Sequence, residues 1–197
     1  MVWTEDRDPK GTSPLKIHEV EFAGLTLNEK MNQVITRINS NQANIYVVTA
    51  LDEVAWLLNM RGNDIPYNPM FFAYVLVFAD KNHTYIFAWN LNSKNTLRYV
   101  FFSRVYIDKK RILDHENLKS HLNGIKIADY DQIYSDLGSL SNSYKIWVSP
   151  MSSYAIYNAV SNKTNLVNNN PSPVRSIKAV KNDVEINNTR ICQVKFF

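Results

Sequence analysis

The sequence has few glycines and only one cysteine. Five of its 197 residues are glycine, and no stretch has the glycine-rich pattern of a loop that cradles phosphate groups. Cys192 alone cannot form a disulfide within the chain, which excludes the disulfide-stapled class of small secreted domains. No neighbouring histidine or helix start would activate Cys192 as a thiolate, so we do not expect a reactive thiol.

Long apolar segments and basic stripes are also lacking. The longest strongly apolar run, from Phe71 to Ala79, is too short to cross a bilayer, and the first residues contain no apolar signal region. The net charge is +4, but the basic residues are scattered, and the densest run is only Lys109-Lys110-Arg111. This distribution is not the basic footprint of a nucleic-acid-binding protein. We therefore expect no nucleic-acid partner, no membrane partner and a cytoplasmic location.

The remaining composition is typical of one folded domain. Hydrophobic residues make up 45% of the chain and aromatic residues 12%, which is enough to build a packed core. The length fits a single domain more simply than two very small ones.

Alternating helical and strand patterns run along the chain. Thr26 and Glu29 form a capping-box signature, and apolar residues from Leu27 to Ile38 then recur on one helical face. We predict helices at about 27–39, 51–59, 115–122, 131–140 and 154–160, and a further one from Ser176, with strands at 45–49, 71–79, 84–89, 97–107, 125–128 and 145–148. In this interpretation Thr49 and Asp52 start the second helix, Gly62 closes it, and Asp114 caps the third. The alternation predicts an α/β domain with a mixed sheet flanked by helices.

Few side chains have the spacing that catalysis or metal binding requires. Asp52 and Glu53 are adjacent, so they do not face each other on a helix, and we interpret them as first-turn acids that offset the helix dipole. His115 and His121 are six positions apart, which does not place them on one helical face as a metal pair. We therefore predict no catalytic residue and no metal ligand in this chain.

The loop after the second predicted helix carries the most suggestive polar set. Arg61, Asp64, Tyr67 and Asn68 lie there, on a segment that two prolines restrict. Loops with polar and aromatic groups on a rigid scaffold are frequent binding sites. The alternative is a local network in which Arg61 pairs with Asp64 to hold the loop.

Several blocks resemble eukaryotic, cytosolic-type aminopeptidase P, a metallopeptidase family. They are the segment from Val47 to Pro69 (VVTALDEVAWLLNMRGNDIPYNP), the segment KIWVS at 145–149 with SYA at 153–155, the exit with Pro173, KAVKN at 178–182 and EI at 185–186, and the entry WTEDR at 3–7. The resemblance covers roughly residues 3–186, and the block of twenty-odd residues from Val47 is far longer than a chance motif.

The resemblance implies the fold, the domain plan and the cofactor. It implies a creatinase N-terminal-domain-like, ribonuclease H-like domain at 20–175, preceded by an entry linker at 1–19. Residues 176–197 would begin the linker helix to a catalytic domain with the pita-bread fold. That domain would bind two divalent metal ions, usually manganese, through ligands that lie beyond this chain. The chain itself would then need no cofactor and would be inactive alone.

The implied function is that of a non-catalytic domain of an Xaa-Pro aminopeptidase, an enzyme that removes an N-terminal residue preceding proline. Its implied partners are the catalytic domain and a second copy in a homodimer. The set Arg61, Asp64, Tyr67 and Asn68 would face the substrate entrance or the catalytic domain. Two alternatives remain, a stand-alone inactive module that binds a protein or peptide, and a truncated regulator of the full-length enzyme. The chain departs from the family pattern in extra residues at about 88–105 and after about Arg190.

Overall fold

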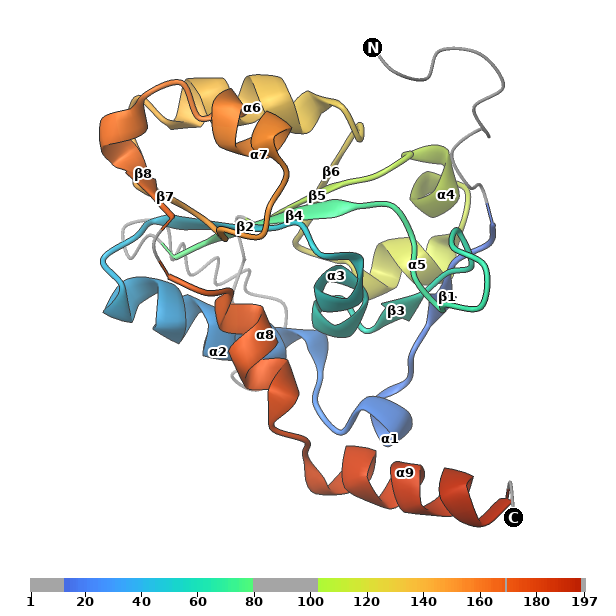
Figure 1. Ribbon diagram of the computed structural model, residues 1–197. Coiled ribbons are helices and arrows are strands. Elements are labelled where there is room, and N and C mark those ends of the chain that lie inside the picture. Colours follow the sequence, from blue (N-terminus) through green and yellow to red (C-terminus); the bar gives the residue numbers. More distant parts are fainter. Residues whose placement is uncertain (1–12, 80–102, 169, 196–197) are drawn as a thin grey trace, which may run out of the picture.

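The computed structural model describes residues 13–79, 103–168 and 170–195. A six-stranded sheet in the order β6-β5-β4-β2-β7-β8 runs through the molecule, with helices on both faces (Figure 1). Its strands are β2 (Ile45–Val48), β4 (Tyr74–Phe78), β5 (Arg104–Tyr106), β6 (Lys126–Ala128), β7 (Ile146–Val148) and β8 (Leu166–Val167). Strand β4 is antiparallel to both of its neighbours, whereas every other pair in this sheet is parallel. The predicted α/β class with a mixed sheet is confirmed.

Strands β2 and β7 form the buried centre of the sheet. Every residue of both strands is buried, as expected for uninterrupted apolar sequences in a sheet covered on two sides. One face is covered by α2 (Leu27–Ser40), α3 (Leu51–Leu57), α5 (Glu116–His121) and α8 (Pro173–Ala179), and the other by α6 (Gln132–Leu140) and α7 (Tyr154–Ala159) (Figure 1). Each face therefore has its own apolar core.

Helix α2 follows the sequence prediction closely. The Thr26 hydroxyl accepts a hydrogen bond from the backbone of Glu29, and the Glu29 carboxylate accepts one from the backbone of Thr26 at 2.8 Å. This capping box satisfies amides that the first helical turn leaves free. The predicted apolar face is buried, with Met31, Val34 and Ile38 fully enclosed.

The start of α3 differs from the prediction. The residue at its N-cap is Ala50, which offers no side-chain cap, so neither Thr49 nor Asp52 begins the helix. The Thr49 hydroxyl instead shares a hydrogen bond of 2.9 Å with the hydroxyl of Ser152, which follows β7. A side chain expected to act locally thus joins the ends of two neighbouring strands.

The end of α3 is also not where the glycine pattern placed it. The helix stops at Leu57, and Asn59 adopts the left-handed conformation with φ 49°. Asparagine is one of the few residues that tolerate this region. Gly62 is required for packing instead, because a Cβ atom there would lie 2.7 Å from the Cβ of Phe71.

A helix that the pattern missed follows β5 in the described chain. Helix α4 (Lys110–Leu113) precedes α5, so Asp114 is the C-cap of α4, and His115 is the N-cap of α5. The predicted turn at 80–83 and the predicted strand at 84–89 lie outside the described residues. The same holds for most of the extra segment at 88–105 and for the first part of the strand predicted at 97–107, of which β5 is the described portion.

Both ends of the described chain pack near α3. Strand β1 (Lys16–Ile17), in the segment predicted as a linker, pairs with β3 (Met60–Arg61) in a separate two-stranded sheet. It is followed by α1 (Val20–Ala23). The helix predicted from Ser176 is two helices, α8 and α9 (Asp183–Lys195), and α9 lies beyond the layered body beside α1 (Figure 1). A short 3-10 helix, η2 (Lys163–Asn165), precedes β8.

Among the described residues, no helix combines the length and the apolar character that crossing a membrane requires.

Candidate functional site

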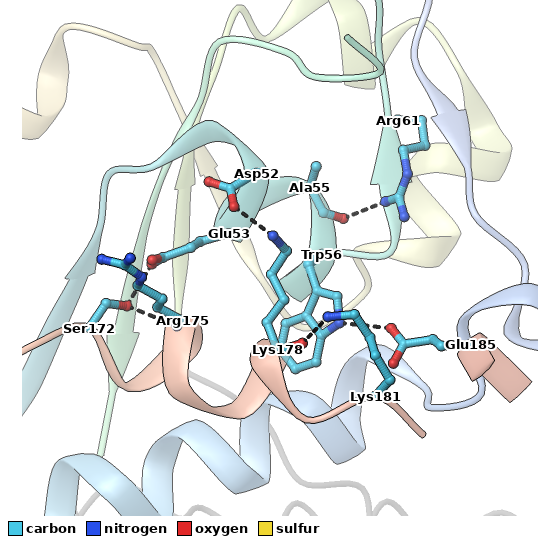
Figure 2. A network of polar contacts seen from close by, with 10 residues as sticks. All are labelled: Asp52, Glu53, Ala55, Trp56, Arg61, Ser172, Arg175, Lys178, Lys181 and Glu185. Atoms are coloured by element: carbon cyan, nitrogen blue, oxygen red, sulfur yellow. Dashed lines mark hydrogen bonds and ion pairs between the residues drawn. The ribbon is translucent and has the colours of Figure 1, made fainter. Parts of the chain in front are cut away.

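The four predicted site residues lie at the end of β3 and in the loop that leads to β4, but this segment does not bring them together. Arg61 lies at the end of β3, and its guanidinium donates to the backbone carbonyl oxygens of Ala55 at 3.0 Å and Met60 at 2.9 Å. Burial, the largest influence, lowers the pKa of Arg61. The side chain therefore holds the end of α3 and does not point along the loop (Figure 2).

Asp64 anchors the base of the loop through a distant partner. Its carboxylate receives two hydrogen bonds from Arg111 of α4, at 2.7 and 2.9 Å, and a third from the backbone of Phe72 at 2.8 Å. The Asp64 side chain is 0% exposed and that of Arg111 is 8% exposed. The predicted pairing of Arg61 with Asp64 is wrong, because Asp64 pairs with Arg111, 47 positions away, and Arg61 donates to backbone carbonyl oxygens.

Tyr67 and Asn68 form the exposed tip of the loop. The Tyr67 side chain is fully open to solvent, and its backbone has φ 63°, an uncommon conformation for a residue other than glycine. The Asn68 amide donates to the carbonyl oxygen of Pro66 at 3.1 Å, and the Asn68 backbone donates to that of Ile65 at 3.1 Å. The loop thus presents an aromatic ring from a base that the buried Asp64 holds in place.

A second candidate site lies at the carboxyl ends of β2 and β7, and the sequence patterns did not predict it. A cleft of about 750 Å³ opens there. We call it the β2–β7 cleft, and its lining consists of Tyr46, Thr49, Ala50, Asp52, Glu53, Tyr74, Ser149, Pro150, Met151, Ser152, Ser153, Pro171, Ser172 and Arg175. In open α/β sheets, ligands bind outside the carboxyl ends of strands where the chain departs in opposite directions. Helix α3 follows β2 on one face, and α7 follows β7 on the other (Figure 1).

Glu53 is the buried acid of this cleft. Its residue exposure is 5%, and its Oε2 accepts a hydrogen bond of 2.6 Å from the hydroxyl of Ser172, the N-cap of α8. Burial is the main reason that the pKa of Glu53 is raised, because desolvation penalises the charged carboxylate. Within the described chain, no hydrogen-bond donor reaches its other oxygen, Oε1.

The neighbouring charges form one tight pair and leave one cation at the rim. The Lys178 ammonium lies 2.6 Å from the Asp52 carboxylate, joining α8 to α3 (Figure 2). The exposed Arg175 lines the cleft, and the positive charges of Lys178 and Arg175 both lower the pKa of Glu53 against the larger effect of burial. The first-turn position predicted for Asp52 and Glu53 is confirmed, but both acids also bind α8, which no local pattern indicates.

A second set of contacts links α3 to α9. The indole nitrogen of Trp56 donates to the Glu185 carboxylate at 3.2 Å (Figure 2). Beneath the same indole, the buried ammonium of Lys30 lies 4.3 Å from the ring centre and donates to Asn59 Oδ1 at 2.6 Å. Burial lowers the pKa of Lys30 to about 8. This cluster fixes α9 against the body by specific polar contacts.

The described residues do not fit the two-metal centre implied for the family's catalytic domain. Such a centre needs several Asp, Glu or His side chains that converge on one point. Within 13–79, 103–168 and 170–195, no group of three or more His, Cys, Asp or Glu is placed to hold a metal ion. The carboxylates of Asp52, Asp64 and Asp136 each pair with a lysine or arginine instead. Cys192 is exposed on α9.

Comparisons with known proteins identify where this fold occurs. The family model of the Creatinase/Prolidase N-terminal domain matches residues 6–101 and 96–185. The two matched segments meet at the stretch where the sequence predicts extra residues. An uncharacterized peptidase of Schizosaccharomyces pombe is 32% identical over 196 residues, which cover 99% of this chain and 28% of that protein. A probable Xaa-Pro aminopeptidase P of Paracoccidioides lutzii is 29% identical over 209 residues, covering 99% and 30% respectively.

Solved structures agree with these sequence matches. The X-prolyl aminopeptidase of Caenorhabditis elegans, described as a cytosolic enzyme with a di-nuclear active site, superposes with a TM-score of 0.75 at 26% identity over 92% of this chain and 27% of its own. The Xaa-Pro dipeptidase of Bacillus anthracis, at 13% identity and a TM-score of 0.52 over 82% of this chain and 38% of its own, shares the fold. The chain thus spans less than a third of the curated relatives it matches.

Proposed function

Because the chain belongs to the Creatinase/Prolidase N-terminal domain family, we propose that it serves as the non-catalytic domain of an Xaa-Pro aminopeptidase. In this role it supports the metal-dependent catalytic domain and the assembly of the dimer. The whole enzyme removes an N-terminal residue that precedes proline, acts in the cytosol and holds its manganese ions in the catalytic domain. The matches to probable Xaa-Pro aminopeptidase P proteins over 99% of the chain support this assignment.

The observation that carries the supporting role is the exposed apolar surface of α9. Ile191 and Val194 are three positions apart, so they share one helical face, and they are 46% and 79% exposed. Val180, just before the helix, is 78% exposed, and Phe22 of the neighbouring α1 is 50% exposed. Large apolar side chains left exposed to solvent are candidates for contact with another domain. We assign this surface to the catalytic domain.

The tip of the β3–β4 loop supplies a second contact in this proposal. The fully exposed ring of Tyr67 stands on a backbone that the buried Asp64–Arg111 pair immobilises. Aromatic side chains held in place lose little entropy on binding and are enriched among residues that dominate interfaces. Tyr67 and Asn68 would therefore contact the catalytic domain or border its substrate entrance, whereas Arg61 and Asp64 would only position the loop.

Grafting tests the proposal. The matching segment of the Caenorhabditis elegans enzyme is replaced by this chain, and hydrolysis of an Xaa-Pro peptide is measured with manganese present. We expect activity from the graft and none from the same enzyme with the segment deleted. A graft that folds, as judged by circular dichroism and thermal unfolding, but is as inactive as the deletion would reject the supporting role.

The isolated chain supplies the complementary measurement. Incubated with manganese and an Xaa-Pro peptide, it is expected to give no turnover, because its described residues do not converge on a metal centre. Peptidase activity that co-purifies with this chain would refute its assignment as non-catalytic.

A further inference from the structure

The β2–β7 cleft has the position and size of a small-molecule site. It lies where adjacent parallel strands send their chains to opposite faces, the usual ligand position in an α/β sheet. Its volume of about 750 Å³ falls within the usual range for ligand pockets. The supporting role proposed above makes no use of this cleft.

The walls of the cleft combine hydroxyl groups with apolar surface. Thr49, Ser149, Ser152 and Ser153 contribute hydroxyls from the ends of the two strands, and Pro150, Met151 and Pro171 contribute apolar contacts. The Met151 side chain is 84% exposed, so it is free to close over an occupant. This lining suits a small ligand that has both polar and apolar parts.

The buried carboxylate of Glu53 defines the charge that such a ligand needs. Among the described residues, the Ser172 hydroxyl is its one hydrogen-bond donor, and Lys178 and Arg175 act on its charge only from beyond salt-bridge distance, so burial still disfavours the charged form. Lys178, a cation close by, is already paired with Asp52 at 2.6 Å. A protonated amine entering the cleft would donate to Oε1 and place a positive charge in direct contact with the carboxylate.

Arg175 supplies the opposite recognition element at the rim. It is exposed, it lines the cleft, and within the described chain no carboxylate lies within salt-bridge distance of its guanidinium. A guanidinium binds a carboxylate or carbonyl oxygen through parallel hydrogen bonds. The buried Glu53 and the exposed Arg175 therefore match a ligand that carries an ammonium group next to a carboxylate or carbonyl oxygen.

We propose that the β2–β7 cleft binds the α-ammonium group of a free amino acid or of a peptide's first residue. Glu53 and the hydroxyl groups accept hydrogen bonds from the amine, and Arg175 donates to the adjacent carboxylate or carbonyl oxygen. The ligand's side chain lies against Pro150, Met151 and Pro171. A free amino acid and the first residue of a peptide both carry this α-ammonium group. They differ because the amino acid has a free carboxylate where the peptide has a carbonyl oxygen.

Amide-detected NMR titrations of the full chain test the proposal with three probes. L-leucine, L-leucylglycine and N-acetyl-L-leucine represent a free amino acid, a peptide and a molecule without the ammonium group. We expect saturable shifts of the Glu53, Ser152 and Ser172 amides with at least one of the first two, and none with N-acetyl-L-leucine at equal concentration. The stronger of the two binders identifies the source. Absence of saturable shifts from both, or equal binding of N-acetyl-L-leucine, would overturn the proposal.

Two variants and one control locate the binding groups. Glu53→Gln keeps an acceptor for Ser172 but removes the charge, so we expect binding about tenfold weaker or more. Arg175→Gln should weaken L-leucine binding in the same direction, and it tests the site on its own if Glu53→Gln unfolds the protein. Glu116→Gln, an exposed acid on α5, should leave binding unchanged. Wild-type affinity in a folded Glu53→Gln variant would contradict the assignment.

Discussion

Individual side chains at the base of the β3–β4 loop determine whether the loop keeps its shape. Asp64 receives three hydrogen bonds, two from Arg111 and one from the backbone, in a buried position. Burying two charges is favourable only while both are present, since removing one leaves the other without compensation. The loop therefore depends on a residue that never contacts its exposed tip.

Replacing Asp64 by asparagine should be strongly destabilising. The change leaves the buried guanidinium of Arg111 without its counter-charge, and we expect the free energy of unfolding to fall by about 3 kcal/mol or more. Glu116→Gln, which breaks an exposed pair with Lys119, should cost less than about 1 kcal/mol. Urea unfolding of both variants measures the difference. Similar losses of unfolding free energy would show that the buried Asp64–Arg111 pair stabilises the fold no more than the exposed pair.

Lys30 should make the stability of the protein depend on pH in the alkaline range. Burial lowers its pKa from 10.5 to about 8, so between these values the unfolded chain holds a proton that the folded chain has released. Stability then rises with pH through this window, because protonation favours the unfolded state. Lys30→Met should remove this rise from the unfolding free energy, whereas Lys145→Met, at an exposed position, should retain it. An identical pH dependence in wild type and Lys30→Met would refute this origin.

At the scale of whole elements, α9 is joined to the body by a small number of polar contacts. The Asn182 side chain accepts from the Glu185 backbone at 2.9 Å, Glu185 accepts from the Asn182 backbone at 3.1 Å, and the Asn182 amide also donates to Ala23 at 2.9 Å. The first pair is a capping arrangement at the helix start. The third contact joins the same residue to α1, so one side chain both begins and docks the helix.

Asn182→Ala should therefore loosen α9 while leaving the sheet intact. Loss of an N-cap costs about 1 kcal/mol, and the bond to Ala23 is lost with it. Hydrogen exchange should become faster in α9 and stay unchanged in α2. Asn188→Ala, which removes a single contact of 3.3 Å to Phe22, serves as the matched control. Unchanged protection of α9 in Asn182→Ala would show that other contacts hold the helix.

Local sequence patterns predicted the elements better than they predicted the contacts between them. The capping box before α2 and the apolar runs of β2 and β7 depend on neighbours in sequence, so they could be recognised. Asp64 and Arg111 are 47 positions apart, and no pattern links them. The β2–β7 cleft is lined by residues from four separate stretches of the chain, within 46–53, at Tyr74, and within 149–153 and 171–175. Polar residues do follow both buried strands in the sequence, but only the fold shows that β2 and β7 are neighbours.

At the scale of the whole molecule, the exposed apolar residues Ile191 and Val194 of α9 should affect assembly of the enzyme much more than stability of the isolated domain. Ile191 and Val194 contribute little to the isolated fold because they are 46% and 79% exposed. Substituting glutamate at both positions should change the unfolding free energy of the isolated chain by less than about 0.5 kcal/mol. In the grafted aminopeptidase the same pair should lower activity and loosen assembly, because two charges would be buried against the catalytic domain.

A control variant introduces the same change in charge on α9 but leaves Ile191 and Val194 in place. Glutamate at the exposed Asn187 and Gln193 adds the same two negative charges to α9 without removing apolar surface. We expect this variant to behave like the unmodified graft in both activity and size-exclusion chromatography. Equal losses from the two double variants would attribute the effect to charge alone. No loss from either would mean that α9 faces solvent in the assembled enzyme, and the catalytic domain would then have to contact another surface of this domain, with the Tyr67 loop as the remaining candidate.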